Sequence, residues 1–123
     1  MIKNLEKKPK NGGRLMAEMF SVNEENFQKE VLESKQPVIV DFTAVWCGPC
    51  KMLDPVVEEL GNEWDGIIRV AKLDVDHNPN LAMQYQVMGV PTLMLFKDGQ
   101  PVERVTGYQP KDRLKKKFNP HLS

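Results

Sequence analysis

The fold of this chain is decided by residues 38–51, which read VIVDFTAVWCGPCK. The first five residues are almost continuously apolar, a pattern typical of a β-strand that is covered on both faces. After the second cysteine, apolar residues recur at the three- and four-residue spacing of a helix. The stretch therefore predicts a buried strand, a short loop that carries two cysteines, and a helix that begins at them.

Cys47 and Cys50 are the only two cysteines in the 123 residues, and Gly48 and Pro49 separate them. Two thiols at this spacing can close into a disulfide and open again, and each cycle exchanges two electrons. At a helix N-terminus, free N–H groups and the helix dipole favour the thiolate of Cys47, whereas Cys50 lies one turn further and should be more buried. We therefore expect Cys47 to attack an external disulfide and Cys50 to resolve the mixed disulfide. Gly48 lets the backbone of a partner approach, and Pro49 stiffens the turn.

Three other roles for the cysteine pair compete with this one. A structural zinc site usually needs about four ligands, and the chain offers two distant histidines, His77 and His121, to complete it. A permanent disulfide across so short a loop would restrain little of the unfolded chain. Inert core cysteines are disfavoured by the Gly-Pro dipeptide between them, which marks a turn.

Asp41 interrupts the apolar run of the first buried strand, and Lys72 interrupts a second run at residues 67–75. A buried carboxylate without a partner is costly, so it keeps its proton or finds a cation. Lys72 is the candidate partner of Asp41. The two form either a structural ion pair or a functional one, in which Asp41 takes the proton of Cys50 when that thiol attacks.

Hydrophobic spacing and turn residues predict the remaining elements on both sides of this stretch. They are an edge strand at 19–22, a helix around Phe27, Val31 and Leu32, a strand at 67–75, a short helix around Leu81 and Tyr85, a strand at 92–96, a returning strand at 102–106 and a last helix from Pro110 onwards. Ser21 or Asn23 should cap the first helix, with Glu24 completing a capping box. Asp98-Gly99 predicts the tight turn of a hairpin between the last two strands.

The order βαβαβα followed by ββα predicts an α/β fold. Crossover helices require parallel strands, while the hairpin adds antiparallel ones. We expect a central mixed sheet of four to five strands, with a parallel core and an antiparallel hairpin, flanked by about four helices. The two cysteines follow the C-terminal end of a central strand, where open α/β sheets place their functional sites.

The helix that begins at the cysteines should bury one stripe of apolar residues. The stripe consists of Met52, Leu53, Val56, Val57 and Leu60. In the last helix, Lys115, Lys116 and Lys117 lie near the C-terminus, where they complement the helix dipole.

The composition is that of an ordinary globular protein. Seventeen basic residues balance seventeen acidic ones, and 41% of the residues are hydrophobic. A zero formal charge argues against nucleic acid as a partner, and no apolar run reaches the roughly 18 residues of a membrane span. The first twenty residues carry charges instead of the apolar core of an export signal, so we expect a cytoplasmic protein. We expect a disordered basic arm at residues 1–17, which are polar and rich in breakers, and a single domain at 18–123.

On these motifs the chain resembles the thioredoxin family. The matching segments are residues 40–51 (VDFTAVWCGPCK), 71–76 (AKLDVD), 89–93 (GVPTL), 96–99 (FKDG) and Gly107. They occur in the family's order, and the resemblance covers residues 18–120. Thr43 departs from many bacterial members, which have a second tryptophan at that position. The resemblance implies the thioredoxin fold.

It also implies a role for each matching residue. Cys47 would be the exposed nucleophile and Cys50 the resolving thiol, with Asp41 as the buried acid/base behind them and Lys72 beside it. Pro91 would follow a cis peptide bond and stand against the disulfide, while the Val90 backbone pairs with an extended substrate segment. The apolar contact surface would consist of Trp46, Gly48, Pro49, Val75, Gly89, Val90, Pro91 and Gly107.

The activity that the resemblance implies is protein-disulfide reduction, which maintains cell redox homeostasis. The protein would bind no cofactor or metal, and its Cys47–Cys50 disulfide would receive electrons from NADPH through a flavin-dependent thioredoxin reductase. Its other partners would be disulfide-containing proteins, and we expect a monomer that binds neither nucleic acid nor membrane. A Gly-Pro dipeptide without histidine favours the reducing end of the family's range. Two alternatives stay open: a disulfide oxidase or isomerase, and a binding module that uses the same surface without turnover.

Overall fold

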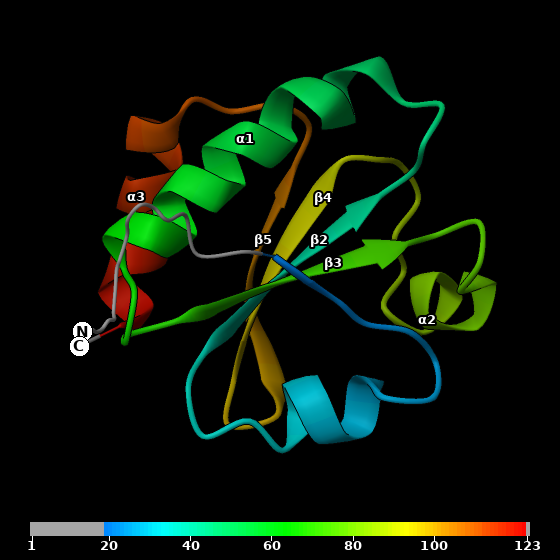
Figure 1. Cartoon of the computed structure of the whole chain (residues 1–123), viewed down its shortest axis with the longest axis horizontal. Helices are drawn as coiled ribbons and strands as arrows, with labels where there is room; N and C mark the ends of the chain where they lie inside the picture. The colour runs from blue at the N-terminus through cyan, green and yellow to red at the C-terminus, as the bar shows by residue number, and fades with distance from the viewer. Residues whose placement is uncertain (1–18, 123) are drawn as a thin grey trace, which may run out of the picture.

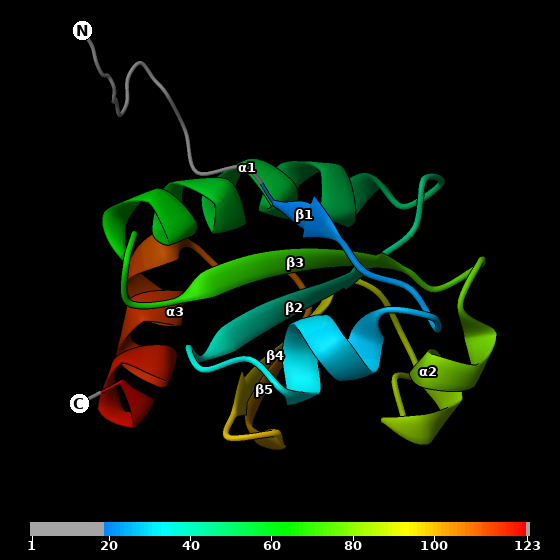
Figure 2. The same cartoon turned by 60° about the horizontal axis from the view of Figure 1, so that its bottom comes forward.

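Five strands form one sheet, and helices cover both of its faces (Figures 1 and 2). The computed structural model describes residues 19–122, so the arm predicted at 1–17 lies outside the described residues. The strands are β1 (Phe20–Ser21), β2 (Val38–Thr43), β3 (Arg69–Asp74), β4 (Thr92–Lys97) and β5 (Gln100–Thr106). The helices are α1 (Gly48–Glu63), α2 (Pro79–Gln84) and α3 (Lys111–Phe118), with a π-helical segment at Gln28–Leu32 and a 3-10 turn at Asn119–His121. None of the helices in this part of the chain has the length and apolar character that crossing a membrane requires.

The sheet has the strand order β1-β3-β2-β4-β5. The strands β1, β3 and β2 are parallel, whereas β4 runs antiparallel to β2, and β5 antiparallel to β4. The predicted mixed sheet with a parallel core and an antiparallel hairpin is therefore confirmed. Phe42, near the end of β2, lies opposite Leu73 near the end of β3 and opposite Thr92 at the start of β4. The loops that follow β2 and β3 consequently meet the loop that precedes β4 at one end of these central strands.

The side chains of β2 alternate between two separate cores. Val38, Val40 and Phe42 lie in one core with Phe27 and other residues on the face covered by the Gln28–Leu32 segment. Ile39 lies in the other core with residues of α1 and α3. Figure 2 shows this layering, with α1 above the sheet and the Gln28–Leu32 segment below it. Every residue of β2 is buried, as the continuous apolar run predicted.

The helix α1 buries a narrower stripe than its sequence predicted. Leu53, Val57 and Leu60 are buried, and Val56 is half-buried. Met52, which we placed in the stripe, is instead 63% exposed. It lies about 100° around the helix from Leu53, which turns its side chain away from the sheet.

Asn23 caps the turn that leads into the Gln28–Leu32 segment, whose own N-cap residue, Phe27, makes no side-chain cap bond, and Glu24 has no part in this cap. Asn23 Oδ1 accepts hydrogen bonds from the N–H groups of Glu25 (2.8 Å) and Asn26 (3.0 Å). Asn26 Oδ1 returns a bond by accepting the N–H of Asn23 at 2.7 Å. The predicted capping box is wrong because the Glu24 carboxylate instead accepts the N–H of Asn80 at 3.0 Å.

Ion pairs hold α3 against α1. Glu63 at the end of α1 pairs with Lys111 and, at 2.9 Å, with Lys115. Lys111 also lies 3.3 Å from Glu59. Hydrogen bonds from the two lysines lower the pKa of Glu63, so its carboxylate stays ionised. Lys115 therefore does more than complement the dipole of its own helix.

The predicted hairpin turn between β4 and β5 is confirmed. Asp98 and Gly99 both have positive φ angles, 53° and 78°. Two such residues in sequence suit the right-handed twist of the strands that they connect. Because β4 begins beside the end of β2, this turn lies at the other end of the sheet from the cysteines (Figure 1).

Candidate active site

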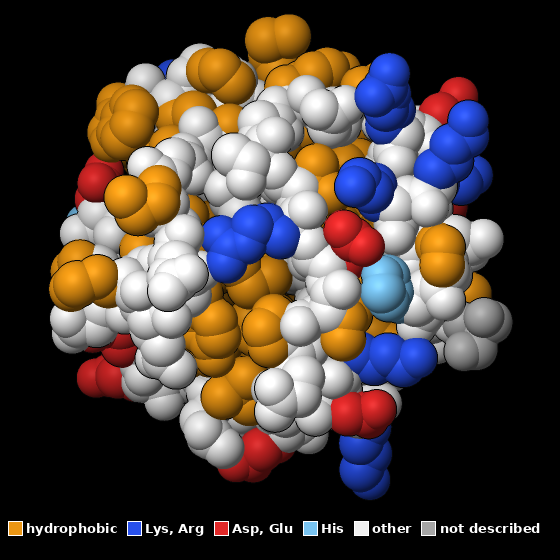
Figure 3. Space-filling model, turned by 180° about the vertical axis from the view of Figure 1, so that it is seen from behind, with side chains coloured by type: hydrophobic (Ala, Val, Ile, Leu, Met, Phe, Trp, Pro, Cys, Tyr) orange, Lys and Arg blue, Asp and Glu red, His pale blue; other side chains and the backbone are white. Residues whose placement is uncertain are grey.

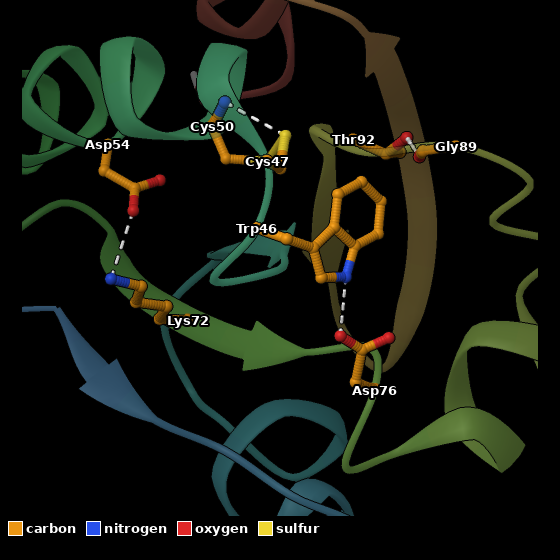
Figure 4. The surroundings of a disulfide bond; sticks show 8 residues. All are labelled: Trp46, Cys47, Cys50, Asp54, Lys72, Asp76, Gly89 and Thr92. Atoms are coloured by element: carbon orange, nitrogen blue, oxygen red, sulfur yellow. Dashed lines mark hydrogen bonds and ion pairs between the residues drawn. A yellow bond between two sulfur atoms is a disulfide. The ribbon is translucent and has the colours of Figure 1, made fainter.

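A disulfide joins Cys47 and Cys50 at the N-terminus of α1 (Figure 4). Cys47 is the N-cap residue, and its Sγ accepts a hydrogen bond from the backbone N–H of Cys50 at 3.2 Å. Pro49 lies in the first turn, where a helix has no internal partner for an N–H group. The N–H of Cys50 and the positive end of the helix dipole thus lie at Cys47 Sγ, and groups of this kind favour a thiolate.

Both cysteines are buried in the disulfide form. Cys47 is 3% exposed and Cys50 is 1% exposed, so the expectation of an exposed Cys47 is wrong for this state. The physical reason is that Val75 and Val90 pack against the two cysteines from neighbouring loops. The residue that stands out into solvent is Trp46, which is 68% exposed.

The ring of Trp46 is fixed from the loop between β3 and α2. Its Nε1 donates a hydrogen bond to Asp76 Oδ2 at 2.7 Å (Figure 4). That loop is itself ordered by Asp74, whose Oδ1 accepts the N–H groups of Asp76 (2.8 Å) and His77 (3.3 Å). The sequence predicted turn chemistry here, but not the bond that holds the indole near the disulfide.

The Val90–Pro91 peptide bond is cis, as the resemblance implied. Thr92 Oγ1 donates to the carbonyl of Gly89 at 2.7 Å, and the N–H of Gly107 donates to the carbonyl of Pro91 at 2.8 Å. These bonds fix the loop before β4 and tie it to the end of β5. Four of the predicted contact residues therefore lie together, namely Gly89, Val90, Pro91 and Gly107. The side chain of Val90 packs against the two cysteines.

Exposed apolar side chains gather around this edge of the molecule. In Figure 3, hydrophobic side chains lie along the edge that holds α2 and the start of α1, while Lys and Arg side chains lie mainly along the opposite edge. Val45, Trp46 and Met83 are among the exposed ones, and Met88 is 95% exposed. Neither methionine was predicted from the sequence to lie on this surface. Only the position of Met88 directly before the Gly-Val-Pro segment pointed to it.

Asp41 lies on β2, two residues after Ile39 and therefore on the sheet face that α1 covers, and it is fully buried. Neither of its carboxyl oxygens has a hydrogen-bond partner among the described residues. Burial, together with the neighbouring carboxyl of Asp54, raises the pKa of Asp41 from 3.8 to about 9, while the ammonium of Lys72 opposes this shift. Asp41 therefore carries a proton at neutral pH in the disulfide form.

Lys72 forms its ion pair with Asp54 and not with Asp41. Asp41 and Lys72 lie opposite each other in the β2–β3 pairing, but Lys72 Nζ is 3.1 Å from Asp54 Oδ2 (Figure 4). The long side chain carries its ammonium past the buried carboxyl to a more exposed one, where a charge loses less hydration. The predicted direct partnership is thus corrected. Sequence reasoning missed Asp54, although its position four residues after Cys50 puts both on one face of α1.

A cleft of about 640 Å³ opens beside these groups. Thr43 and Lys72 line it from the sheet, Cys50 and Asp54 line it from α1, and Asn78 also belongs to the lining. Cys50 and Asp54 of α1 thus border the same cleft as Lys72 of β3.

The two histidines considered for a zinc site bind carboxylates. His77 Nδ1 lies 3.2 Å from Asp74 Oδ2, and His121 Nε2 lies 3.0 Å from Glu103 Oε1. Between residues 19 and 122, no three His, Cys, Asp or Glu side chains are grouped as metal ligands. The zinc alternative therefore finds no ligand set in the described chain.

Comparison with known proteins agrees with this site. The family model described as Thioredoxin matches residues 18–120. The thioredoxin of Staphylococcus haemolyticus (strain JCSC1435) is 48% identical over 104 residues, which are 85% of this chain and 98% of that protein. The thioredoxin of Staphylococcus aureus (strain N315) is 50% identical over 104 residues, with the same shares of the two chains. The chain therefore belongs to the thioredoxin family, whose members are protein-disulfide oxidoreductases.

Proposed function

We propose that the chain is a protein-disulfide reductase in which Cys47 attacks the substrate disulfide and Cys50 resolves the mixed disulfide. The observation that carries this proposal is the disulfide at the start of α1, where Cys47 Sγ accepts the N–H of Cys50. In the reduced protein, the same N–H and the helix dipole favour the thiolate of Cys47 over that of Cys50.

The reaction consists of two thiol–disulfide exchanges. In the first, the Cys47 thiolate bonds to one sulfur of the substrate, and the other substrate sulfur leaves as a thiolate. In the second, the Cys50 thiol loses its proton and attacks the Cys47 sulfur, and the remaining substrate sulfur leaves. The substrate gains two electrons and becomes a dithiol, while the protein ends as the Cys47–Cys50 disulfide.

We assign to Asp41 the proton that Cys50 gives up. Its burial on the sheet face that α1 covers and its raised pKa support this role, since a group of this kind holds the proton in the disulfide form and returns it on reduction. An ordinary surface aspartate, with a pKa near 3.8, would be too weak a base for a thiol.

The substrate would lie across the exposed apolar edge. We assign the contact surface to Trp46, Gly48, Pro49, Val75, Gly89, Val90, Pro91 and Gly107, with an extended substrate segment paired to the Val90 backbone. The fixed, exposed indole of Trp46 and the packing of Val90 against the cysteines support this assignment.

Electrons would come from NADPH through a flavin-dependent thioredoxin reductase, and the protein would work in the cytoplasm as a monomer. The direction of exchange depends on the reduction potential. Known reference values are about −270 mV for thioredoxin and about −180 mV for protein disulfide isomerase, a difference of about a thousandfold in equilibrium. A potential measured close to the isomerase value would contradict the assignment as a reductase.

Reduction of insulin disulfides, with dithiothreitol as the electron source, tests the proposal. The wild type should turn over and Cys47→Ser should not. Cys50→Ser should instead accumulate mixed disulfides with cell proteins, which mass spectrometry can identify. Turnover by Cys47→Ser at the wild-type rate would overturn the assignment of the nucleophile.

A further inference from the structure

Asp54 stands between the buried groups of the site and solvent. It lies four residues after Cys50, so both side chains project from the same face of α1 into the cleft. Its Oδ2 binds Lys72 Nζ at 3.1 Å, while its Oδ1 is buried and has no hydrogen-bond partner in the described chain. The side chain of Lys72 is 43% exposed and that of Asp54 is 17% exposed, so the ion pair joins a mostly buried carboxylate to a partly solvated ammonium.

The ammonium of Lys72 has more than one carboxylate within its reach. Asp41 is its partner in the strand register, and both side chains leave the sheet on the same face. Asp74 lies two residues further along β3 and also lines the cleft. The ammonium nevertheless ends at Asp54, and both oxygens of Asp41 remain without a partner.

We propose that Asp54 is a positioning residue for the resolving step, because by binding Lys72 it keeps the ammonium away from Asp41 and leaves Asp41 able to take the proton of Cys50. This inference rests on the proposed function, since it concerns the second of the two exchanges. In that step the bond between Cys47 and the substrate sulfur breaks, and the Cys47–Cys50 bond forms. The Cys50 proton passes to Asp41, which holds it in the disulfide form.

The charges that face Asp54 give the expected direction of each substitution. They are Lys72 from β3, Asp41 from β2, and Lys51 on α1 and Asp74 on β3 along the cleft. Asp54 raises the pKa of Asp41 and Lys72 lowers it. Asp54→Asn removes the first influence and releases Lys72 toward Asp41, so the pKa of Asp41 falls on both counts. Lys72→Met removes the second influence and has the opposite effect.

A single-turnover reaction with 5,5′-dithiobis(2-nitrobenzoic acid) separates the two exchanges. Stopped-flow mixing with the reduced full-length protein releases one aromatic thiolate when Cys47 attacks and a second when Cys50 resolves. We expect Asp54→Asn to lower the pH midpoint of the second release by about one unit, which is tenfold in proton affinity, and to leave the first unchanged. Lys72→Met should raise the second midpoint. Glu58→Gln, which removes a charge from α1 outside the cleft lining, is the matched control and should change neither.

A double variant shows whether Asp54 acts through Asp41. In an Asp41→Asn background, adding Asp54→Asn should not change the pH midpoint of the second release from its value in the Asp41→Asn single variant. The inference is overturned if the second midpoint of Asp54→Asn equals that of the wild type while the first release is normal. It is also overturned if the shift persists without Asp41. Failure of the first release in the wild-type protein would instead contradict the proposed function itself.

Discussion

Trp46 donates its indole N–H to Asp76 across 30 positions of sequence, and this bond ties the loop before α1 to the loop after β3. The ring is exposed, so packing does little to orient it, and the hydrogen bond sets its direction. The apolar surface beside the disulfide thus depends on a polar contact.

Removing the acceptor should weaken the handling of protein substrates. We expect Asp76→Ala to lower kcat/KM for insulin roughly fivefold, equivalent to about 1 kcal/mol for a hydrogen bond in an exposed position. Asp76→Asn keeps an oxygen for the indole N–H and should retain most of the activity. Equal activity in the Ala variant and the wild type would show that the bond does not position the ring.

The buried Asp41 should make the oxidised protein less stable as pH rises. An aspartate carboxyl has an ordinary pKa of 3.8, and burial raises the pKa of Asp41 to about 9 in the folded disulfide form, so the folded state binds the extra proton between these values. Stability is therefore highest below the lower value and falls as pH rises through the interval. Asp41→Asn abolishes this loss and should raise the free energy of unfolding by about 2–4 kcal/mol at pH 7.

Urea unfolding of the oxidised protein at several pH values measures this effect. The gain from Asp41→Asn should disappear below pH 4, and the exposed Asp98→Asn, in a turn that accepts asparagine, should show no such trend. A gain that does not depend on pH would contradict a buried, protonated Asp41.

At Gly61 the backbone of α1 packs tightly against Val70 of β3. A Cβ at this position would lie 2.7 Å from Val70 Cγ2, and valine has little freedom to turn away. We expect Gly61→Ala to destabilise the protein by about 1–2 kcal/mol, because overpacking outweighs the better helix propensity of alanine. In a Val70→Ala background the same change should be neutral or stabilising, and equal costs in both backgrounds would refute the proposed clash.

Asn78 links the loop before α2 to the first helical turn. Its Oδ1 accepts the N–H of Glu24 at 2.9 Å, and its Nδ2 donates to the carbonyl of Asp74 at 2.9 Å. Asn78→Ala leaves both backbone groups without this partner, and we expect a loss of about 1–3 kcal/mol in urea unfolding. Asn78→Asp keeps the acceptor and loses only the donor, so it should fall between the alanine variant and the wild type.

The sequence predicted the sheet and the position of the cysteines because both depend on short-range signals. Hydrophobic periodicity gave the order of strands and helices, and Asp98-Gly99 gave the hairpin. Asp41 and Lys72, the two polar residues that interrupt the buried runs, are partners in the β2–β3 pairing. These features depend on the backbone, which local patterns describe well.

The features that the sequence did not predict depend on the path of individual side chains and on contacts between distant segments. Lys72 reaches past its register partner to Asp54, and no pattern records the length and path of that side chain. Met52 keeps helical spacing but falls on the outer side of α1. The burial of Cys47 results from Val75 and Val90, which come from loops about thirty and forty positions further on.

The placement of β2 between β3 and β4 divides the active site between two halves of the chain. A cut in the exposed connection at Asp65-Gly66 would leave both cysteines and Asp41 on one fragment, and Lys72, Asp76 and Pro91 on the other. The second fragment cannot close its own sheet, because β2, which lies between β3 and β4, is on the first fragment. Fragment complementation at this point would therefore couple disulfide exchange to reassembly, and the enzyme's own turnover would report when two fused partners meet.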